Sequence, residues 1–454
     1  MPRPKQRPEA QPGRRVISPS ACMQITLQKH QSQKDRWKPR VEQVKRNLRK
    51  AGKHADANGV GVPGEDCVYD VKFCPFLPPD APPIFAFTSG QNVFVARING
   101  DAKQPFEVLD AIEDVDEDRN TKTLGTDSYQ SHNSLAWMRD PQSDDPLLLF
   151  SGTVPKIHVY NVARKERFKT LTGHGSGIQD IVPHPTIPSI FATCSDDNEV
   201  RLWNLSSKFE DSWCAVICHG EFGHTSTVYS ISFTKNGRYL LSGGRDTWVH
   251  LWALPDRNEL VLLPKEKVKS KRIYYPHFSS ADVHADIVDC VRFYGDLIFS
   301  RSVGYKITCW RIDGFSSEDP IPDPPTKQVP GRRTRSAFGA GFTVLFTFNH
   351  MDGDAIPNYW HRFNIFPGVD GKPVLAMGDL SAAKIHFWDL EKLELDREAS
   401  EFTGDPLEAL EADEKLVPFL DKKNIGLYRS LDWSPDGKWL VAGYDGATLL
   451  ICWK

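Results

Sequence analysis

Six short segments of the chain end in the same way, and this repetition limits the possible folds more than any other feature. Each segment alternates apolar and polar residues and places an aromatic residue near its end. The aromatic residues are Tyr160, Trp203, Trp252, Trp310, Trp388 and Trp453, which lie 43, 49, 58, 78 and 65 residues apart in turn. One blade of a β-propeller repeats every roughly 40 to 45 residues, so the shorter intervals match a blade and the longer ones indicate insertions.

A second strand pattern recurs upstream of these segments. It alternates apolar with polar residues and often ends in a turn signal, as in VYSISFTKNG at 228–237 and YRSLDWSPDG at 428–437. The pattern occurs five times, beginning at 178, 228, 288, 359 and 428, and two further units that begin at 68 and 133 bring the number of blades to seven. The sequence therefore predicts an all-β fold, a seven-bladed WD-repeat β-propeller over residues 66–454. Loop insertions between the blades are expected at 101–131, 255–286, 313–357 and 391–425.

Two blades carry a fuller signature that joins a histidine, a hydroxyl, an aspartate and a tryptophan. One set is His174, Thr193, Asp197 and Trp203, and the other is His224, Ser242, Asp246 and Trp252. We expect a buried hydrogen-bond relay from indole to hydroxyl to imidazole to carboxylate. A Ser-His-Asp catalytic set is the alternative, but the pattern recurs and its hydroxyl falls inside a strand rather than on an exposed elbow. No catalytic residue is therefore predicted, and the chain is not expected to be an enzyme.

Charge is unevenly distributed, although the net charge is only −3. Residues 1–65 are predicted to be a basic, largely flexible extension, and CMQITLQ within it, from Cys22 to Gln28, is the best candidate for a strand that closes the ring. The basic stretch 37–53 could instead form an independent helix. Lys and Arg residues around Trp37 make a weak nucleic-acid contact possible, with a solvated tail as the alternative.

The cysteines and the hydropathy of the chain exclude several classes of protein. The nine cysteines are odd in number and lack a C-x-x-C pair, so neither a disulfide framework nor a zinc ribbon is predicted, and no metal or cofactor is expected. No run of about 18 apolar residues exists, and the basic N-terminus has no apolar segment of a signal peptide. We therefore expect an intracellular protein with no membrane partner.

The segment 272–312 is far more specific than a generic blade. Its runs PHFSSADVH and VDCVRFYGDLIFSRS resemble the EED/Extra sex combs family, the WD-repeat subunit of the Polycomb repressive histone methyltransferase complex. Further matches are GHGSGIQDIVPHP, DDNEVRLWNL, YWHRF at 359–363 and YRSLDWSPDG. The resemblance covers roughly residues 66–454.

This resemblance implies a non-catalytic scaffold and histone-tail reader in the nucleus. The implied partners are a SET-domain histone lysine methyltransferase, a zinc-finger Polycomb subunit and a histone tail whose trimethyl-lysine enters an aromatic cage. An aromatic cage suits this ligand because a quaternary ammonium cannot donate hydrogen bonds, whereas each π face attracts it by about 0.5 to 2 kcal/mol. The alternative is a WD-repeat scaffold or substrate receptor of another nuclear assembly, such as a ubiquitin ligase, that reads no methyl-lysine.

The same resemblance implies the residues of the site. Tyr69, Tyr359 and Trp360 match cage aromatics, and Arg429 matches an arginine beside the cage. A core role is the alternative for Tyr69. For Tyr359 and Trp360 the alternative is that at least one of them packs inside, because neighbouring strand residues point to opposite faces.

Other positions depart from the family pattern. Asn133 stands where the family has a cage tyrosine, and Tyr129 is the nearest aromatic that could replace it. Gln179 and Asp289 match a groove asparagine and a groove aspartate, and Asp196 replaces a groove lysine. Asp289 could equally belong to the framework of its blade. These changes are expected to alter the preference for the peptide or to weaken it.

Overall fold

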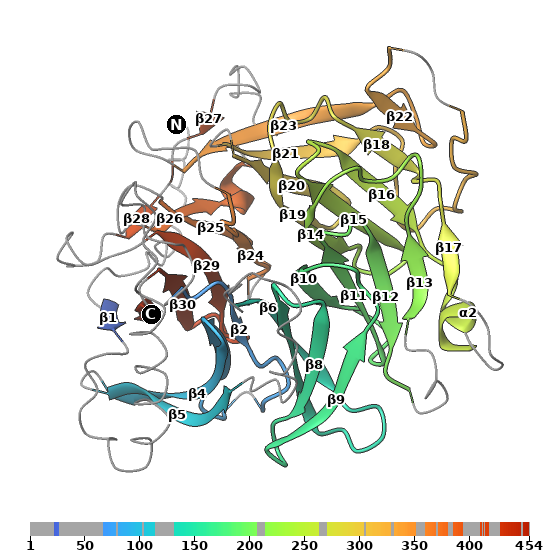
Figure 1. The fold of residues 1–454 in the computed structure, drawn as a ribbon. Helices are drawn as coiled ribbons and strands as arrows, with labels where there is room; N and C mark the ends of the chain where they lie inside the picture. The colour runs from blue at the N-terminus through green and yellow to red at the C-terminus, as the bar shows by residue number, and fades with distance from the viewer. Residues whose placement is uncertain are drawn as a thin grey trace, which may run out of the picture.

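The computed structural model gives seven sheets, which Figure 1 shows arranged around a common centre. It describes residues 22–26, 67–78, 80–101, 104–113, 131–206, 214–262, 270–303, 306–327, 331–350, 359–368, 371–379, 385–393, 409–410, 412, 414–416, 427–445 and 448–453. Within the sheets neighbouring strands are antiparallel, apart from two short parallel pairs at outer edges. The all-β propeller predicted from the repeat is confirmed.

The first four sheets follow chain order from the centre outwards. The first contains β2 (Val71–Phe73), β3 (Ile84–Ser89), β4 (Asn92–Asp101) and β5 (Gln104–Glu113). The second contains β6 (His132–Arg139), β7 (Pro146–Gly152), β8 (Lys156–Asn161) and β9 (Glu166–Thr172). The third contains β10 (Ile178–Pro183), β11 (Ile190–Ser195), β12 (Val200–Asn204), β13 (Cys214–Cys218) and β17 (Lys271–Ile273). The fourth contains β14 (Val228–Phe233), β15 (Tyr239–Gly244), β16 (Val249–Ala253), β18 (Phe278–Ser280) and β22 (Thr334–Ser336).

The remaining three sheets bring the two ends of the chain together. The fifth contains β19 (Val288–Tyr294), β20 (Leu297–Ser302), β21 (Lys306–Ile312), β23 (Phe342–Asn349) and β27 (Ala409–Leu410). The sixth contains β24 (Asn364–Phe366), β25 (Val374–Gly378), β26 (Ile385–Asp389) and β28 (Glu414–Leu416). The last contains β29 (Tyr428–Trp433), β30 (Trp439–Tyr444), β31 (Thr448–Trp453) and β1 (Cys22–Thr26).

Strand β1 lies antiparallel to β31 as the outer strand of the last sheet, with Cys22 opposite Cys452 and Thr26 opposite Thr448. The rest of the N-terminal extension, including the basic stretch around Trp37, lies outside the described residues. The division of the chain into an extension and a propeller at residue 66 stays a prediction.

The core consists of apolar layers between neighbouring sheets. One layer joins Phe85 and Phe87 of the first sheet to Val441 and Ile451 of the last. The tryptophans that mark the repeat are buried in such layers, and Trp203, Trp252, Trp310 and Trp388 are each at most 1% exposed. Each sheet therefore buries its faces against its neighbours, as expected for a blade that is unstable alone.

The predicted insertions proved shorter than expected, because each contains strands of a blade. Strand β5 lies in the insertion expected at 101–131, β18 in that at 255–286, β23 in that at 313–357 and β28 in that at 391–425. Strands β5 and β28 carry charged residues and β18 is only three residues long, so these strands lack the apolar signal of the inner strands. Strand β23 has an apolar run without a charged residue, but it begins at Phe342, far beyond the end of β21 at Ile312, so the spacing of the repeat did not assign it to a blade. The segment 255–286 also holds the short helix α2 (Arg257–Leu262).

No helix among the described residues is long and apolar enough to span a membrane.

Candidate ligand-binding site

A cavity of about 410 Å³ opens at one end of the ring. Six residues that were singled out from the sequence line it, namely Tyr69, Asn133, Gln179, Asp196, Tyr359 and Trp360. Inner strands begin and second strands end at this side of the ring, since Asn133 and Gln179 lie at the starts of β6 and β10 while Asp196 directly follows β11. The strand ends of several blades thus supply one pocket.

A break in strand register places many of these side chains. In five sheets the pairing of the innermost strand with the second strand shifts near the start of the inner strand and passes over one residue. The residues passed over are Asn133, Gln179, Tyr229, Asp289 and Arg429. A β-bulge re-aims a side chain out of the regular alternation. The bulges therefore turn one residue per blade toward the end of the channel.

One part of the wall is an aromatic cluster of Tyr69, Tyr229, Tyr359 and Trp360. The ring of Trp360 lies 5.5 Å from that of Tyr69 and 5.9 Å from that of Tyr229. The rings of Tyr229 and Tyr359 are 5.7 Å apart. Tyr359 is 46% exposed, whereas Tyr69 and Tyr229 are less than a tenth exposed. The cluster therefore contributes four aromatic rings to the wall of the pocket, and Tyr69 and Tyr229 are mostly packed.

Sequence reasoning missed Tyr229. It also missed Ser131, Thr153, Thr227 and Arg245, which line the same cavity. A signal for the tyrosine was present, because Tyr229 follows Val228 at the start of an inner strand as Tyr69 follows Val68. Aligning the starts of the repeats would have paired the two tyrosines.

The pair Tyr359 and Trp360 lies before strand β24 rather than within a strand, so the expectation that these two are neighbouring strand residues is wrong. Trp360 has a φ of 76°, a left-handed conformation that costs a non-glycine residue about 1–3 kcal/mol. Because the backbone is not extended here, the two side chains need not point to opposite faces, and their rings lie 6.4 Å apart.

Asp289 holds this strained backbone and does not line the cavity. Its Oδ2 accepts hydrogen bonds from the backbone N–H groups of Trp360 at 2.9 Å and His361 at 3.2 Å. It also forms a fully buried ion pair with Arg301. Burial raises the pKa of Asp289, and Arg301 opposes that rise. Asp289 is thus part of the framework that positions Trp360.

Arg362 fixes the same loop from across the ring. Its guanidinium donates to Asp180 Oδ1 at 2.5 Å and to the carbonyl of Gln179 at 2.6 Å. Burial alone would raise the pKa of Asp180, but Arg362 and Arg292 more than compensate and hold it below its ordinary value. The loop before β24 of the sixth sheet is therefore bonded to β10, the innermost strand of the third sheet.

Arg429 stands behind the cluster rather than in the cavity. Its guanidinium carbon lies 5.5 Å from the centre of the Tyr69 ring, and two of its nitrogens contact Asp445 at 2.6 and 2.9 Å. Burial would lower the pKa of Arg429, but Asp445 raises it above the ordinary value. The guanidinium of Arg429 therefore packs against the Tyr69 ring, and Asp445 neutralises its charge.

The rest of the described wall is polar. Asn133 is 2% exposed, and its Oδ1 accepts a hydrogen bond from the hydroxyl of Ser131 at 3.1 Å. Gln179 donates to Asp196 Oδ1 at 2.8 Å. Tyr129, the candidate replacement for the missing aromatic, lies outside the described residues. The site thus combines an aromatic side with an amide and carboxylate side.

The two predicted relays are confirmed. Trp252 Nε1 donates to Ser242 Oγ at 3.0 Å, Ser242 Oγ lies 2.8 Å from His224 Nε2, and His224 Nδ1 lies 3.0 Å from Asp246. An indole can only donate, so the hydroxyl passes its own proton toward the histidine, which donates to the carboxylate. Burial opposes ionisation of Asp246, but His224 lowers its pKa to about 2. The matching set ends on Asp197, whose pKa His174 likewise lowers to about 2.

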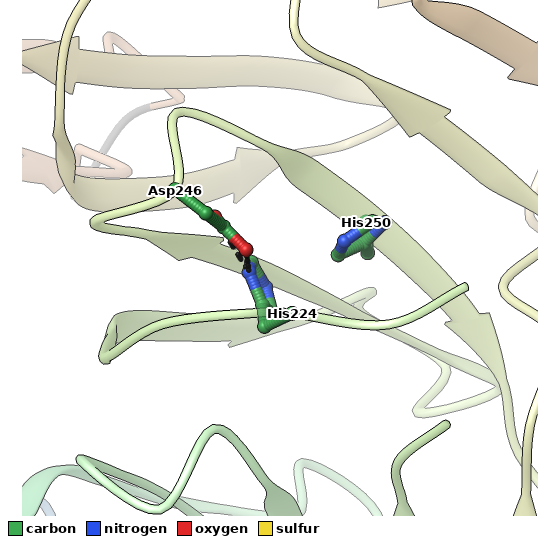
Figure 2. Close-up of side chains that lie close together, drawn as sticks. All are labelled: His224, Asp246 and His250. Carbon is green, nitrogen blue, oxygen red and sulfur yellow. Dashed lines mark hydrogen bonds and ion pairs between the residues drawn. The ribbon is translucent and has the colours of Figure 1, made fainter. Parts of the chain in front are cut away.

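Figure 2 shows that His250 lies beside His224 and Asp246, close enough for the three to be considered as metal ligands. Both ring nitrogens of His224 are already engaged by Asp246 and Ser242. Burial also lowers the pKa of His250 well below its ordinary value. The group is therefore best explained as the buried relay of its blade with a neutral neighbouring imidazole.

Comparisons with known proteins agree with this architecture. The family model described as WD domain, G-beta repeat matches residues 165–204, 217–253 and 424–451. The chain is 37% identical over 371 residues to Polycomb protein EED of Chaetomium thermophilum, which covers 78% of this chain and 61% of that protein. It is 25% identical to Polycomb protein esc of Drosophila melanogaster, with 84% of this chain and 80% of that protein covered. The chain thus spans less than two thirds of the Chaetomium relative's length.

Solved structures give the same picture. A chain of ctPRC2 in complex with H3K27me3 is 31% identical, with a TM-score of 0.74, and the match covers 85% of this chain and 93% of that one. A chain of apo ctPRC2 in an autoinhibited state is 32% identical, with a TM-score of 0.73 and coverage of 86% and 94%. The similarity in fold therefore extends over nearly the whole of both structural neighbours.

Proposed function

Because this chain belongs to the EED/Extra sex combs family of WD-repeat Polycomb proteins, we propose that it is a non-catalytic scaffold and histone-tail reader of a Polycomb repressive complex. It binds a methylated lysine at the aromatic pocket. It also supports the activity of a SET-domain histone lysine methyltransferase, which is a separate chain.

One observation carries the reader half of the proposal: four aromatic rings gather at the mouth of a single cavity. Tyr359 and Trp360 come from a loop held in a strained conformation, and Asp289 and Arg362 fix that loop from two sides. Such a pre-formed site spends little binding free energy on ordering its side chains. A methylated ammonium, which is poorly hydrated and attracted to π faces, is the ligand that this wall suits.

The reader half is tested by calorimetry with the full chain and histone-tail peptides that differ only in lysine methylation. We expect micromolar affinity for methylated peptide and much weaker binding of the unmodified one. Tyr359→Ala should weaken the methylated complex, because it removes the most exposed ring of the cluster. Equal affinity for methylated and unmodified peptides would remove the reader role.

The scaffold half concerns partners. We propose that the ring binds the SET-domain subunit and a zinc-finger Polycomb subunit in the nucleus, and that binding of a methylated tail shifts the enzyme toward its active state. Affinity purification of the tagged chain should recover the SET-domain protein. Recovery of ubiquitin-ligase subunits in its place would favour the alternative of a substrate receptor.

A weak nucleic-acid contact by residues 1–55 belongs to the same proposal, since Lys and Arg there can neutralise phosphates. Deleting residues 1–21 would remove part of this charge while keeping strand β1. The salt-dependent affinity for nucleosomal DNA should then fall. If the affinity stayed unchanged both in this variant and in a variant that lacks residues 1–55, the contact would be dismissed.

A further inference from the structure

The polar side of the pocket carries hydrogen-bond acceptors that a trimethyl-lysine cannot use. Asp196 and Gln179 line the same cavity as the aromatic cluster. Gln179 is 4% exposed, and its Nε2 donates to Asp196 Oδ1 at 2.8 Å. This contact fixes the orientation of the amide, because a flipped amide would set its oxygen against the carboxylate oxygen.

With the amide so oriented, Gln179 Oε1 is buried and has no hydrogen-bond partner among the described residues. Buried acceptors are normally paired, so this oxygen is available to a donor that enters the cavity, whether water or a ligand. The neighbouring Asp196 is an acceptor when ionised and presents a negative charge. Together, the two side chains would favour a ligand that carries a positive charge and donates a hydrogen bond.

Several groups beside the cavity affect the charge of Asp196. Burial raises the pKa of Asp196, and the carboxylate of Asp197 raises it further, whereas hydrogen bonds from Gln179 and Thr227 and the charge of Arg245 lower it. A cation in the pocket would favour the ionised form of Asp196 again. Arg245 also lines the cavity, but it is exposed, so solvent and salt screen its charge more than they screen a buried one.

Asn133 provides a second reason why the pocket suits a trimethyl group less well. It is buried at the wall where the resemblance predicts a tyrosine, and an amide offers no π face to a methyl group. The described rings that remain, Tyr69, Tyr229, Tyr359 and Trp360, form one packed cluster. Methyl groups can contact that cluster while another substituent of the nitrogen faces the acceptors.

From this arrangement we infer that the pocket prefers mono- or dimethyl-lysine to trimethyl-lysine, with an ammonium N–H donated to Asp196 or Gln179. Dimethyl-ammonium keeps one N–H and monomethyl-ammonium keeps two, whereas trimethyl-ammonium has none. Unmodified lysine has three, but it lacks the methyl groups that contact the rings. This inference rests on the proposed reader function and specifies its ligand.

The test is calorimetry of the full chain with one histone-tail peptide prepared in four states of lysine methylation. We expect the dimethyl peptide to bind about tenfold more tightly than the trimethyl peptide, since a charge-assisted hydrogen bond contributes enough for that factor. Asp196→Asn should reduce this ratio, because the amide can still accept from Gln179 but carries no charge to strengthen a hydrogen bond from the ammonium. Asn133→Tyr should reduce the ratio by strengthening trimethyl binding.

Asp144→Asn is the matched control, because Asp144 lies in the turn at the other end of the β6–β7 hairpin and should leave the ratio unchanged. The unmutated chain alone decides the inference, so a variant that fails to fold does not prevent a result. Trimethyl binding equal to or tighter than dimethyl binding overturns the inference while the reader function stands. Equal binding of all four peptides would instead overturn the reader function.

Discussion

Replacing Arg362 by methionine should destabilise the ring substantially, because the guanidinium neutralises a buried carboxylate from across the channel. The side chains of Arg362 and Asp180 are 3% and 2% exposed, and their closest atoms are 2.5 Å apart. Without the arginine, Asp180 keeps Arg292 at 3.8 Å and the charge of Lys72, together with the hydroxyls of Ser134 and Ser230 at 3.3 Å. Breaking a buried pair in this way costs about 3–5 kcal/mol.

The size of the propeller sets the thermal shift. Unfolding entropy of about 2.1 cal/mol/K per residue gives about 0.8 kcal/mol/K for the ring, so the melting temperature of Arg362→Met should fall by about 4–6 °C. Far-ultraviolet circular dichroism and tryptophan fluorescence should be followed together, because coincident transitions are needed before a free energy is assigned. The double variant Asp180→Asn, Arg362→Met should be more stable than the sum of the single losses predicts.

The pH dependence supplies an independent check. The pKa of Asp180 lies below its ordinary value in the folded chain, so its contribution to stability is present above about pH 3.9 and is lost as pH falls through the folded value. The unmutated chain and Arg362→Met should therefore converge in stability toward that acid range. A melting temperature of Arg362→Met within about 1 °C of the unmutated chain at pH 7, or strict additivity in the double variant, would refute the assignment.

Three further predictions follow from other contacts. Trp360→Ala and Trp360→Gly should both weaken methylated peptide by about 2- to 30-fold in calorimetry, but the glycine variant should melt higher because glycine accepts a φ of 76° without strain. Asp246→Asn should lower the free energy of unfolding by about 2 kcal/mol at pH 7 but by little near pH 2. His224 holds the pKa of Asp246 near 2, so the contribution of this carboxylate to stability disappears as pH falls through that value. Equal losses at both pH values would contradict this. Gly378→Ala should cost about 1–3 kcal/mol in chemical denaturation, because a Cβ would lie 2.2 Å from the Tyr428 ring, and an unchanged midpoint would show that the ring moves aside.

The features of the fold that could be predicted are those that repeat. Trp203, Trp252, Trp310 and Trp388 end strands that are buried on both faces, so their apolar signal is strong and regular. The outer strand β28 is short and charged and has no such signal, because solvent at the sheet edge tolerates charged residues. Strand β23 is apolar, but it lies far along the chain from β21, so its position did not match the repeat. Both strands were therefore expected to belong to insertions.

The site was predictable only in part, because resemblance identified residues but not their geometry. Tyr359 and Trp360 were expected in a strand, and the left-handed backbone at Trp360 depends on Asp289, which is 71 residues away in the chain. Tyr229 escaped notice because its segment is an ordinary inner strand by alternation. Long-range contacts that select a rare backbone conformation leave no local signal in the sequence.

The bulge at the start of the inner strands lets packing of the interior and choice of the residue at the pocket be met by different positions. Residues on either side of the skipped position, such as Val228 and Ser230, belong to the packed interior and are fully buried. The skipped residue itself lines the cavity or contacts a residue that does. One blade can therefore exchange a tyrosine for an asparagine or a glutamine with little repacking of the interior, so that ligand choice can drift during evolution blade by blade while the ring that displays it stays the same.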